Sequence, residues 1–336
     1  MRMTKVRVGV IGVAVDRHPR VHLRALKSME DVELVAFCDI NEPILTKACE
    51  EYGVTQRFLD RREMLDKAKM DAVWVVCDYR FTYDVAMDCL AAGVNTFMEK
   101  PPGLSIQECR QMADTAAKSG CKGMVGFNRR FNRVIAEAKR LLEGSKPASG
   151  FSGPGGIRAV DANFGKARAV GRFTDKDGHP VPPLRVDAIH HVDALRYLLG
   201  DAEVEQVMGA CARHYSHEYD SFHALIKFKG GAIAQLNSNY NALKLERISL
   251  FAEEAWAELL GLQEQQINSG KAYVDGCWHE LKEDVRPGRT DSLGFWDEDR
   301  FFIDCVKDDK PVAYPACDLN NGVKTLELVN AILADT

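Results

Sequence analysis

The chain has 336 residues, of which 46% are hydrophobic and 28% charged, a balance typical of globular proteins with substantial cores. Its formal net charge is −5 and its basic residues are scattered, which excludes the electrostatic surface of a nucleic-acid-binding protein. The length corresponds to one large domain or two of ordinary size.

The cysteines and apolar runs bear on the compartment. Ten cysteines are present, none in a C-x-x-C pair, which favours a reduced protein over a disulfide framework. The first predicted strand begins at Val6, leaving no room for a signal peptide, and no apolar run approaches the ~20 residues of a membrane span. We therefore expect a cytoplasmic protein that does not bind nucleic acid or a membrane.

Strands and helices are predicted to alternate through residues 1–127, the pattern of a doubly wound parallel sheet. The expected strands span 6–11, 32–38, 71–76, 95–98 and 122–127. The expected helices span 22–29 and 105–118, and the second of these begins with a Ser105–Glu108 capping box. A further helix is expected to be capped by Asn41, and another to end near 90. This half is predicted to be a dinucleotide-binding domain.

The pattern changes after Phe127. Helices are expected over 131–142 and 187–199, and residues 144–156, rich in Gly, Ser and Pro, predict a loop. Strands are expected over 158–164, 205–212, 223–228, 232–240 and 246–251, with a hairpin turn at Lys229-Gly230-Gly231. Residues 128–317 therefore predict an α+β domain with a large, mostly antiparallel open sheet, whose uncovered face suits a homodimer or homotetramer. A last helix in 318–336 is expected to return to the first domain.

A glycine turn after the first strand suggests a dinucleotide phosphate site. The G-x-G-x-x-G fingerprint starts at Gly12, but Ala14 replaces its second glycine and the third is missing. Asp16 places an anion here, which the nearby Arg17 offsets by offering contacts to phosphate oxygens.

Asp39 ends the second strand, where a carboxylate accepts hydrogen bonds from an adenosine ribose. The alternative role, capping the next helix, is one that Asn41 can fill. Because an anion repels a 2′-phosphate, the sequence favours NAD over NADP.

Lys100 follows the apolar strand 94–98 and precedes two prolines, each of which fixes φ and lacks an N–H. Open α/β sheets bind ligands at the carboxyl ends of their strands, so Lys100 is predicted to be an aimed cation. The alternative is a solvated lysine in a strand-to-helix turn.

The segment 187–193, DAIHHVD, is predicted to begin a helix. Residues three and four apart share a helix face, which would put Asp187 beside His190 and His191 and suit a general base. The alternative is a polar helix end with one buried histidine. No metal site is predicted, because His214 and His217 lack convergent partners.

Three motifs occur in order along the chain. They are Glu99-Lys100-Pro101, the segment 126–131 (GFNRRF) and the segment 190–200 (HHVDALRYLLG). Together they resemble the Gfo/Idh/MocA oxidoreductases, relatives of glucose–fructose oxidoreductase and myo-inositol dehydrogenase, over nearly the whole chain. The resemblance implies a Rossmann domain, a C-terminal α/β domain on an open sheet, and NAD-dependent chemistry on a sugar or polyol.

Carried onto this sequence, the resemblance implies that Lys100 and His190 form an acid/base pair assisted by Asp187. Arg129, Asp193 and His191 are expected to bind substrate. Cofactor contacts are assigned to Gly12, Val13, Ala14, Arg17, Asp39, Ile40, Cys77, Asp78, Glu99, Lys100 and Asn128.

Two departures from the family pattern qualify these assignments. The family has an aspartate four residues before its catalytic histidine, whereas here position 186 is valine and Asp187 is three before His190. Either Asp187 serves from a neighbouring position or His191 takes the role. After the strand at 71–76 the family has T-P-x-x-x-H, and this chain instead has CDYRFTY.

The expected activity is hydride transfer between a carbinol and nicotinamide. Two alternatives stay open: a glycosidase or C–O lyase that uses transient oxidation, and a non-catalytic NAD or sugar sensor.

Overall fold

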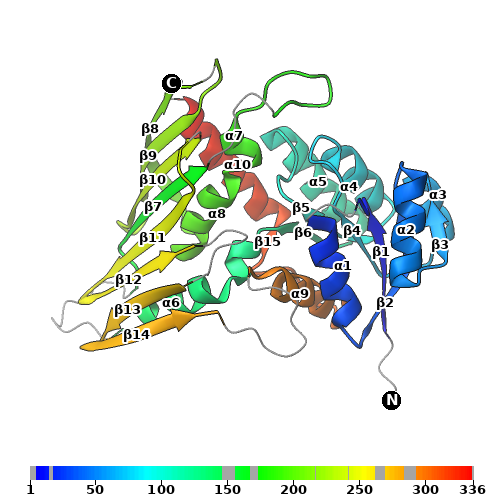
Figure 1. Ribbon diagram of the computed structural model, residues 1–336, viewed down its shortest axis with the longest axis horizontal. Coiled ribbons are helices and arrows are strands. Elements are labelled where there is room, and N and C mark those ends of the chain that lie inside the picture. The colour runs from blue at the N-terminus through cyan, green and yellow to red at the C-terminus, as the bar shows by residue number, and fades with distance from the viewer. Residues whose placement is uncertain are drawn as a thin grey trace. The chain divides into compact units, whose positions relative to one another are not determined.

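The computed structural model of the protein (Figure 1) describes residues 5–14, 18–145, 156–166, 173–215, 217–240, 242–261, 269–283 and 293–334. The chain divides into two compact units. Unit 1 comprises Met1–Asn128 and Val285–Val323, and unit 2 comprises Arg129–Asp284 and Lys324–Thr336. The predicted loop at 144–156 lies almost wholly outside the described residues.

Unit 1 is built on a seven-stranded sheet in the order β15-β6-β5-β4-β1-β2-β3. Its strands are β1 (Val6–Ile11), β2 (Val32–Cys38), β3 (Gln56–Phe58), β4 (Ala72–Val75), β5 (Asn95–Glu99), β6 (Gly123–Gly126) and β15 (Cys317–Asp318). All neighbours are parallel except β15, which pairs antiparallel with β6. The order 3-2-1-4-5-6 within this sheet is that of the Rossmann fold, which confirms the predicted fold class.

The helices of unit 1 follow from local signals in the sequence. They are α1 (His18–Ser28), α2 (Glu42–Tyr52), α3 (Arg61–Lys67), α4 (Thr82–Ala91), α5 (Ile106–Ser119) and α9 (Phe295–Lys307). Asn41 caps α2 by accepting the Ile44 N–H, and Ser105 caps α5 by accepting the Glu108 N–H at 3.1 Å. Both caps were predicted. The short β3 and α3 were not, because neither has a long periodic apolar pattern.

Late segments of the chain join unit 1. The indole N–H of Trp74 on β4 donates to Asp299 Oδ1 on α9 at 2.7 Å, and α9 also packs on α1. The sequence prediction assigned residues up to 317 to the second domain, whereas residues Val285–Val323 group with unit 1.

Unit 2 is built on an eight-stranded sheet in the order β14-β13-β12-β11-β7-β10-β9-β8. Its strands are β7 (Ala159–Lys166), β8 (Val204–Ala212), β9 (Ser221–Phe228), β10 (Ile233–Tyr240), β11 (Leu245–Ala252), β12 (Ala255–Leu260), β13 (Ser269–Val274) and β14 (Cys277–Lys282). Only β7 and β10 pair in parallel, which confirms a mostly antiparallel sheet. The predicted hairpin joins β9 to β10, with Gly230 and Gly231 both at positive φ.

The helices of unit 2 line one face of this sheet (Figure 1). They are the 3-10 turn η1 (Asn128–Phe131), which begins in unit 1, α6 (Arg133–Glu143), α7 (Pro183–Val186), α8 (Ile189–Leu198) and the later part of α10 (Leu319–Ala334). The prediction of one helix over 187–199 was wrong at its start. Asp187 is the C-cap of α7, and α8 begins at Ile189.

Among the described residues, no helix combines the length and apolar character that a membrane crossing requires.

Candidate active site

The turn after β1 packs the backbone of Gly12 closely against the segment that follows β4. Gly12 has φ +89°, and a Cβ there would lie 2.6 Å from the backbone of Cys77. A side chain at this position is disfavoured by the positive φ and would also clash with the Cys77 backbone. Only glycine therefore fits at this position, the first glycine of the predicted phosphate turn.

Asp39 ties this turn to the end of β2. Its Oδ2 accepts the backbone N–H of Val13 and its Oδ1 accepts that of Asn41, both at 2.9 Å. The carboxylate is thus held at the carboxyl edge of the sheet beside Val13 and Ala14. Ile40, 92% exposed, extends from the same edge.

Two more of the predicted cofactor residues follow β4. Burial raises the pKa of the half-buried Cys77 thiol to about 11, so it is neutral at physiological pH. Asp78 binds Arg80 with both oxygens, at 2.9 and 2.8 Å, and this hydrogen bonding lowers the pKa of Asp78. Arg17 lies outside the described residues.

Lys100 comes directly after β5, at the same carboxyl edge. Its backbone N–H donates to Glu99 Oε2 at 3.1 Å, while Glu99 Oε1 lies 3.0 Å from His22 Nε2. Glu99 is buried and Lys100 is half-buried. Asn128 is also buried and donates from Nδ2 to the Leu293 carbonyl at 3.0 Å. The structure thus brings the described cofactor residues and Lys100 to one edge of the unit 1 sheet.

In unit 2, Asp187 is bound by two neighbouring strands. Lys166 Nζ at the end of β7 donates to Asp187 Oδ1 at 2.8 Å, and the Tyr240 hydroxyl at the end of β10 donates to Oδ2 at 3.0 Å. Tyr240 and Lys166 are register partners across the parallel β7–β10 pair. The sheet therefore fixes the position of this nearly buried carboxylate.

The two histidines on α8 have different surroundings. His191 is fully buried and stacks on Phe164 with the ring centroids 3.3 Å apart, and its Nε2 lies 3.6 Å from Glu246 Oε1. Arg129 Nη2 pairs with the same Glu246 oxygen at 2.5 Å. His190 is half-buried and so retains access to solvent, which makes it the better placed of the two to exchange a proton.

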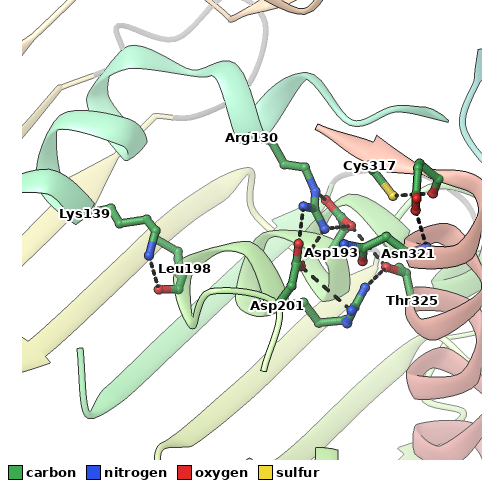
Figure 2. Close-up of polar contacts among 10 residues, drawn as sticks. Arg130, Lys139, Asp193, Leu198, Asp201, Cys317, Asn321 and Thr325 are labelled. Carbon is green, nitrogen blue, oxygen red and sulfur yellow. Dashed lines mark hydrogen bonds and ion pairs between the residues drawn. The ribbon is translucent and has the colours of Figure 1, made fainter. Parts of the chain in front are cut away.

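Asp193 lies inside a buried network rather than on an open surface (Figure 2). Arg130 donates to it from Nε at 2.7 Å and from Nη2 at 2.8 Å, and the Thr325 hydroxyl adds a contact at 3.1 Å. Arg130 also binds Asp201 at 2.8 and 2.9 Å. In this conformation the carboxylate binds Arg130, whereas the sequence predicted a contact with substrate.

Sequence reasoning missed the residues that hold the site together. These residues make polar contacts across long separations in sequence. They are Lys166, Tyr240 and Glu246 on the strands of unit 2, and His22 and Asp299 in unit 1. One usable signal was Glu246, which alternates with Ile248 and Leu250 and so falls on the apolar face of its strand.

Comparison with known proteins identifies the family. Residues 6–127 match the model of the Gfo/Idh/MocA oxidoreductase family with its NAD-binding Rossmann fold, and residues 154–258 match the family's C-terminal domain. Together these matches cover more than half of the chain. The chain belongs to the Gfo/Idh/MocA family.

Named relatives of this Gfo/Idh/MocA protein align over most of its length. It is 26% identical to myo-inositol 2-dehydrogenase of Thermotoga maritima, covering 80% of this chain and 81% of that protein. It is 29% identical to D-glucoside 3-dehydrogenase of Escherichia coli, covering 81% and 82%. The fold matches the crystal structure of aldose-aldose oxidoreductase from Caulobacter crescentus complexed with glycerol, with a TM-score of 0.83, 19% identity and coverage of 98% and 97%.

The residues at the unit 1 edge fit the NAD that the family binds. The tight turn at Gly12 suits the pyrophosphate, and the fixed carboxylate of Asp39 suits a ribose with free hydroxyls. The first glycine of the fingerprint, Gly12, has the positive φ of such a turn, although Ala14 replaces the second glycine.

Proposed function

We propose that the protein is an NAD-dependent dehydrogenase that oxidises a secondary hydroxyl of a sugar or polyol, or reduces the matching carbonyl. The observation that carries the proposal is the position of Lys100, a cation directly after β5 at the carboxyl edge of an NAD-binding sheet. The names of the aligned relatives, an inositol and a glucoside dehydrogenase, support the substrate class.

In the proposed mechanism, NAD supplies the hydride acceptor for the carbinol carbon. Lys100, as an ammonium, stabilises the negative charge that develops on the substrate oxygen as its proton leaves. The hydrogen bond from its own backbone N–H to Glu99 holds the start of this segment in place.

His190 is proposed to take the hydroxyl proton, because histidine is the side chain that most often serves as a general base. Lys166 and Tyr240 hold the carboxylate of Asp187, which lies three residues before His190. Asp187 is proposed to assist His190 by fixing the position of this short segment. Arg129 keeps one buried donor, Nη1, without a hydrogen bond in the described part of the chain, which supports a role in binding a substrate oxygen.

The cofactor contacts remain as assigned from the sequence. We propose that Gly12, Val13, Ala14 and Arg17 bind the pyrophosphate, that Asp39 and Ile40 bind the adenosine, and that Cys77, Asp78, Glu99, Lys100 and Asn128 border the nicotinamide end.

The competing activity is a glycosidase or lyase that oxidises its substrate transiently. Both enzymes need NAD, but only the dehydrogenase accumulates NADH in proportion to product. The experiment is titration of the purified protein with NAD⁺ and NADP⁺, then a sugar and polyol panel that includes glycosides, with NADH and product both quantified. Stoichiometric NADH supports the dehydrogenase, product without NADH supports the alternative, and cofactor binding with no product from the panel supports a sensor.

We further propose that the protein forms homodimers or homotetramers through the outer face of the unit 2 sheet. Large apolar side chains are exposed there on strands β8, β9, β10, β11, β12 and β14: Met208, Leu225, Ile233, Leu245, Phe251, Leu260 and Trp278. Exposed apolar residues on a monomer are usually scattered singly, whereas these gather on one face of a sheet, as at an association surface. Light scattering on the wild type and on Phe251→Glu is expected to show an oligomer and its dissociation, respectively, and a monomeric wild type would contradict the proposal.

A cytoplasmic location is proposed from the cysteines. All ten are free thiols, which suits a reducing compartment.

A further inference from the structure

His22 on α1 is fully buried between two carboxylates. Its Nδ1 lies 2.8 Å from Asp299 Oδ1 on α9 and its Nε2 lies 3.0 Å from Glu99 Oε1 on β5. A neutral imidazole has a single N–H, so only the protonated ring donates to both carboxylates at once. Burial alone lowers the pKa of His22, but the charges and hydrogen bonds of Asp299 and Glu99 outweigh it and raise the pKa well above 6.5.

The groups that surround this ring come from three elements, α9, β5 and β4. Glu298 on α9 is also buried, and one of its carboxylate oxygens lies within 4.8 Å of a His22 nitrogen and a Glu99 oxygen. Phe97 on β5 and Phe295 on α9 contact the ring edge-on, with centroids 5.2 and 5.3 Å away. Trp74 on β4 donates to the same Asp299 oxygen that faces His22. The imidazole is therefore packed between aromatic rings and carboxylates that restrict its movement.

Glu99 transmits this restraint to Lys100. One Glu99 oxygen faces His22, and the other accepts the Lys100 backbone N–H at 3.1 Å. Both oxygens of the carboxylate are thus engaged, so its rotation is restricted. On its other side His22 contacts Asp299 on α9, which lies 277 positions away in the sequence. The contacts therefore run from Asp299 through His22 to Glu99.

We propose that His22 is a positioning residue of the dehydrogenase, which fixes the Glu99–Lys100 corner by bridging Glu99 to Asp299. The inference rests on the proposed function, because positioning has a catalytic effect only where Lys100 acts on the substrate. A small displacement of a catalytic group costs up to about 100-fold in rate, so the bridge is worth measuring by turnover.

The experiment compares wild type with His22→Gln and Asp299→Asn, both of which preserve approximate side-chain volume. Lys307→Gln is the matched control, since Lys307 lies on the same helix α9 but forms a partly exposed ion pair with Asp31 at 2.6 Å. Measured are the affinity for NAD⁺, kcat and KM at a temperature where each variant is folded, and the rate at which Lys100 is reductively methylated, followed by mass spectrometry.

His22→Gln is expected to lower kcat by about 10- to 100-fold and to change the methylation rate of Lys100, with affinity for NAD⁺ retained. Lys307→Gln is expected to leave kcat within about twofold. Folded His22→Gln with wild-type kcat and wild-type Lys100 methylation would overturn the proposal.

If His22→Gln does not fold, Asp299→Asn provides the same test. A lowered kcat and a changed Lys100 methylation rate would then support the proposal, and wild-type values of both would overturn it. Absence of turnover by the wild type on the whole panel would count against the proposed function instead, and the Lys100 methylation rates would then still decide whether His22 positions this corner.

Discussion

Arg130 and Asp193 form a bidentate ion pair in the interior of unit 2, with nitrogen–oxygen distances of 2.7 and 2.8 Å and both side chains shielded from solvent. One residue comes from the GFNRRF motif and the other from the HHVDALRYLLG motif. The pair joins η1 to α8, so at these two positions the motifs have a structural role in common. Breaking a buried pair leaves a charge without compensation, which is costly.

Asp193→Asn is therefore expected to lower the free energy of unfolding by about 3–5 kcal/mol. Folded Asp193→Asn enzyme is expected to keep the wild-type KM. Urea unfolding and steady-state kinetics check this, with Asp201→Asn as control, because Asp201 is the more exposed partner of Arg130 and its positive φ suits asparagine. A stable Asp193→Asn variant with a KM raised tenfold or more would instead support the substrate-binding role that the sequence predicts for Asp193.

Tyr240→Phe tests the anchoring of Asp187. The variant removes one side-chain donor from this carboxylate and leaves that of Lys166, and a hydrogen bond to a charged group contributes about 1.5–3 kcal/mol. We expect a loss of that size in unfolding free energy and a changed pH profile of kcat. Tyr215→Phe, at a tyrosine of unit 2 that is 74% exposed, is the control and is expected to change neither quantity. Wild-type behaviour of Tyr240→Phe in both measurements would exclude an anchoring role.

Gly12→Ala tests the cofactor turn. Its Cβ would lie 2.6 Å from Cys77 backbone atoms, so we expect lost NAD⁺ binding in calorimetric titration and reduced stability. Gly53→Ala is the matched control, since Gly53 also has a positive φ (+73°) but has nothing within 4 Å of its would-be Cβ. The control is expected to lose about 1 kcal/mol in stability and to bind NAD⁺ normally. Normal NAD⁺ binding by Gly12→Ala would move the pyrophosphate elsewhere.

His22 predicts a specific dependence of stability on pH. Because its pKa is raised in the folded state, the stabilisation is complete below about pH 6.5, the unfolded pKa, and is lost as the pH rises toward the folded value. Urea unfolding of the wild type between pH 6 and pH 9 is expected to show this fall. The difference in stability between wild type and His22→Gln is expected to shrink over the same interval, and a constant difference would show that His22 does not titrate there.

The sequence predicted what depends on local pattern. Apolar runs located β1 and β2 with the correct bounds, and Asn41 and Ser105 were recognised as caps because capping involves residues only three apart. The fold class followed, since the alternation of strand and helix is itself local.

What the sequence did not predict is long-range. Asp187 was expected to face His190 and His191 on one helix, but Lys166 and Tyr240, 21 and 53 residues away, hold its carboxylate at a break between two helices. The role of Asp193 depended on whether Arg130, 63 residues earlier, would bind it. Helical periodicity carries no information about which distant charge meets which, so such partners emerge only from the fold.

The most direct test of the central claim is turnover of Lys100→Ala. On a substrate that the wild type oxidises, NADH formation is monitored at the nicotinamide absorbance, and NAD⁺ affinity is measured in parallel. We predict NAD⁺ binding close to that of the wild type and a kcat reduced by at least about 100-fold, the scale of one lost electrostatic stabiliser. Wild-type kcat in Lys100→Ala would contradict the proposed mechanism.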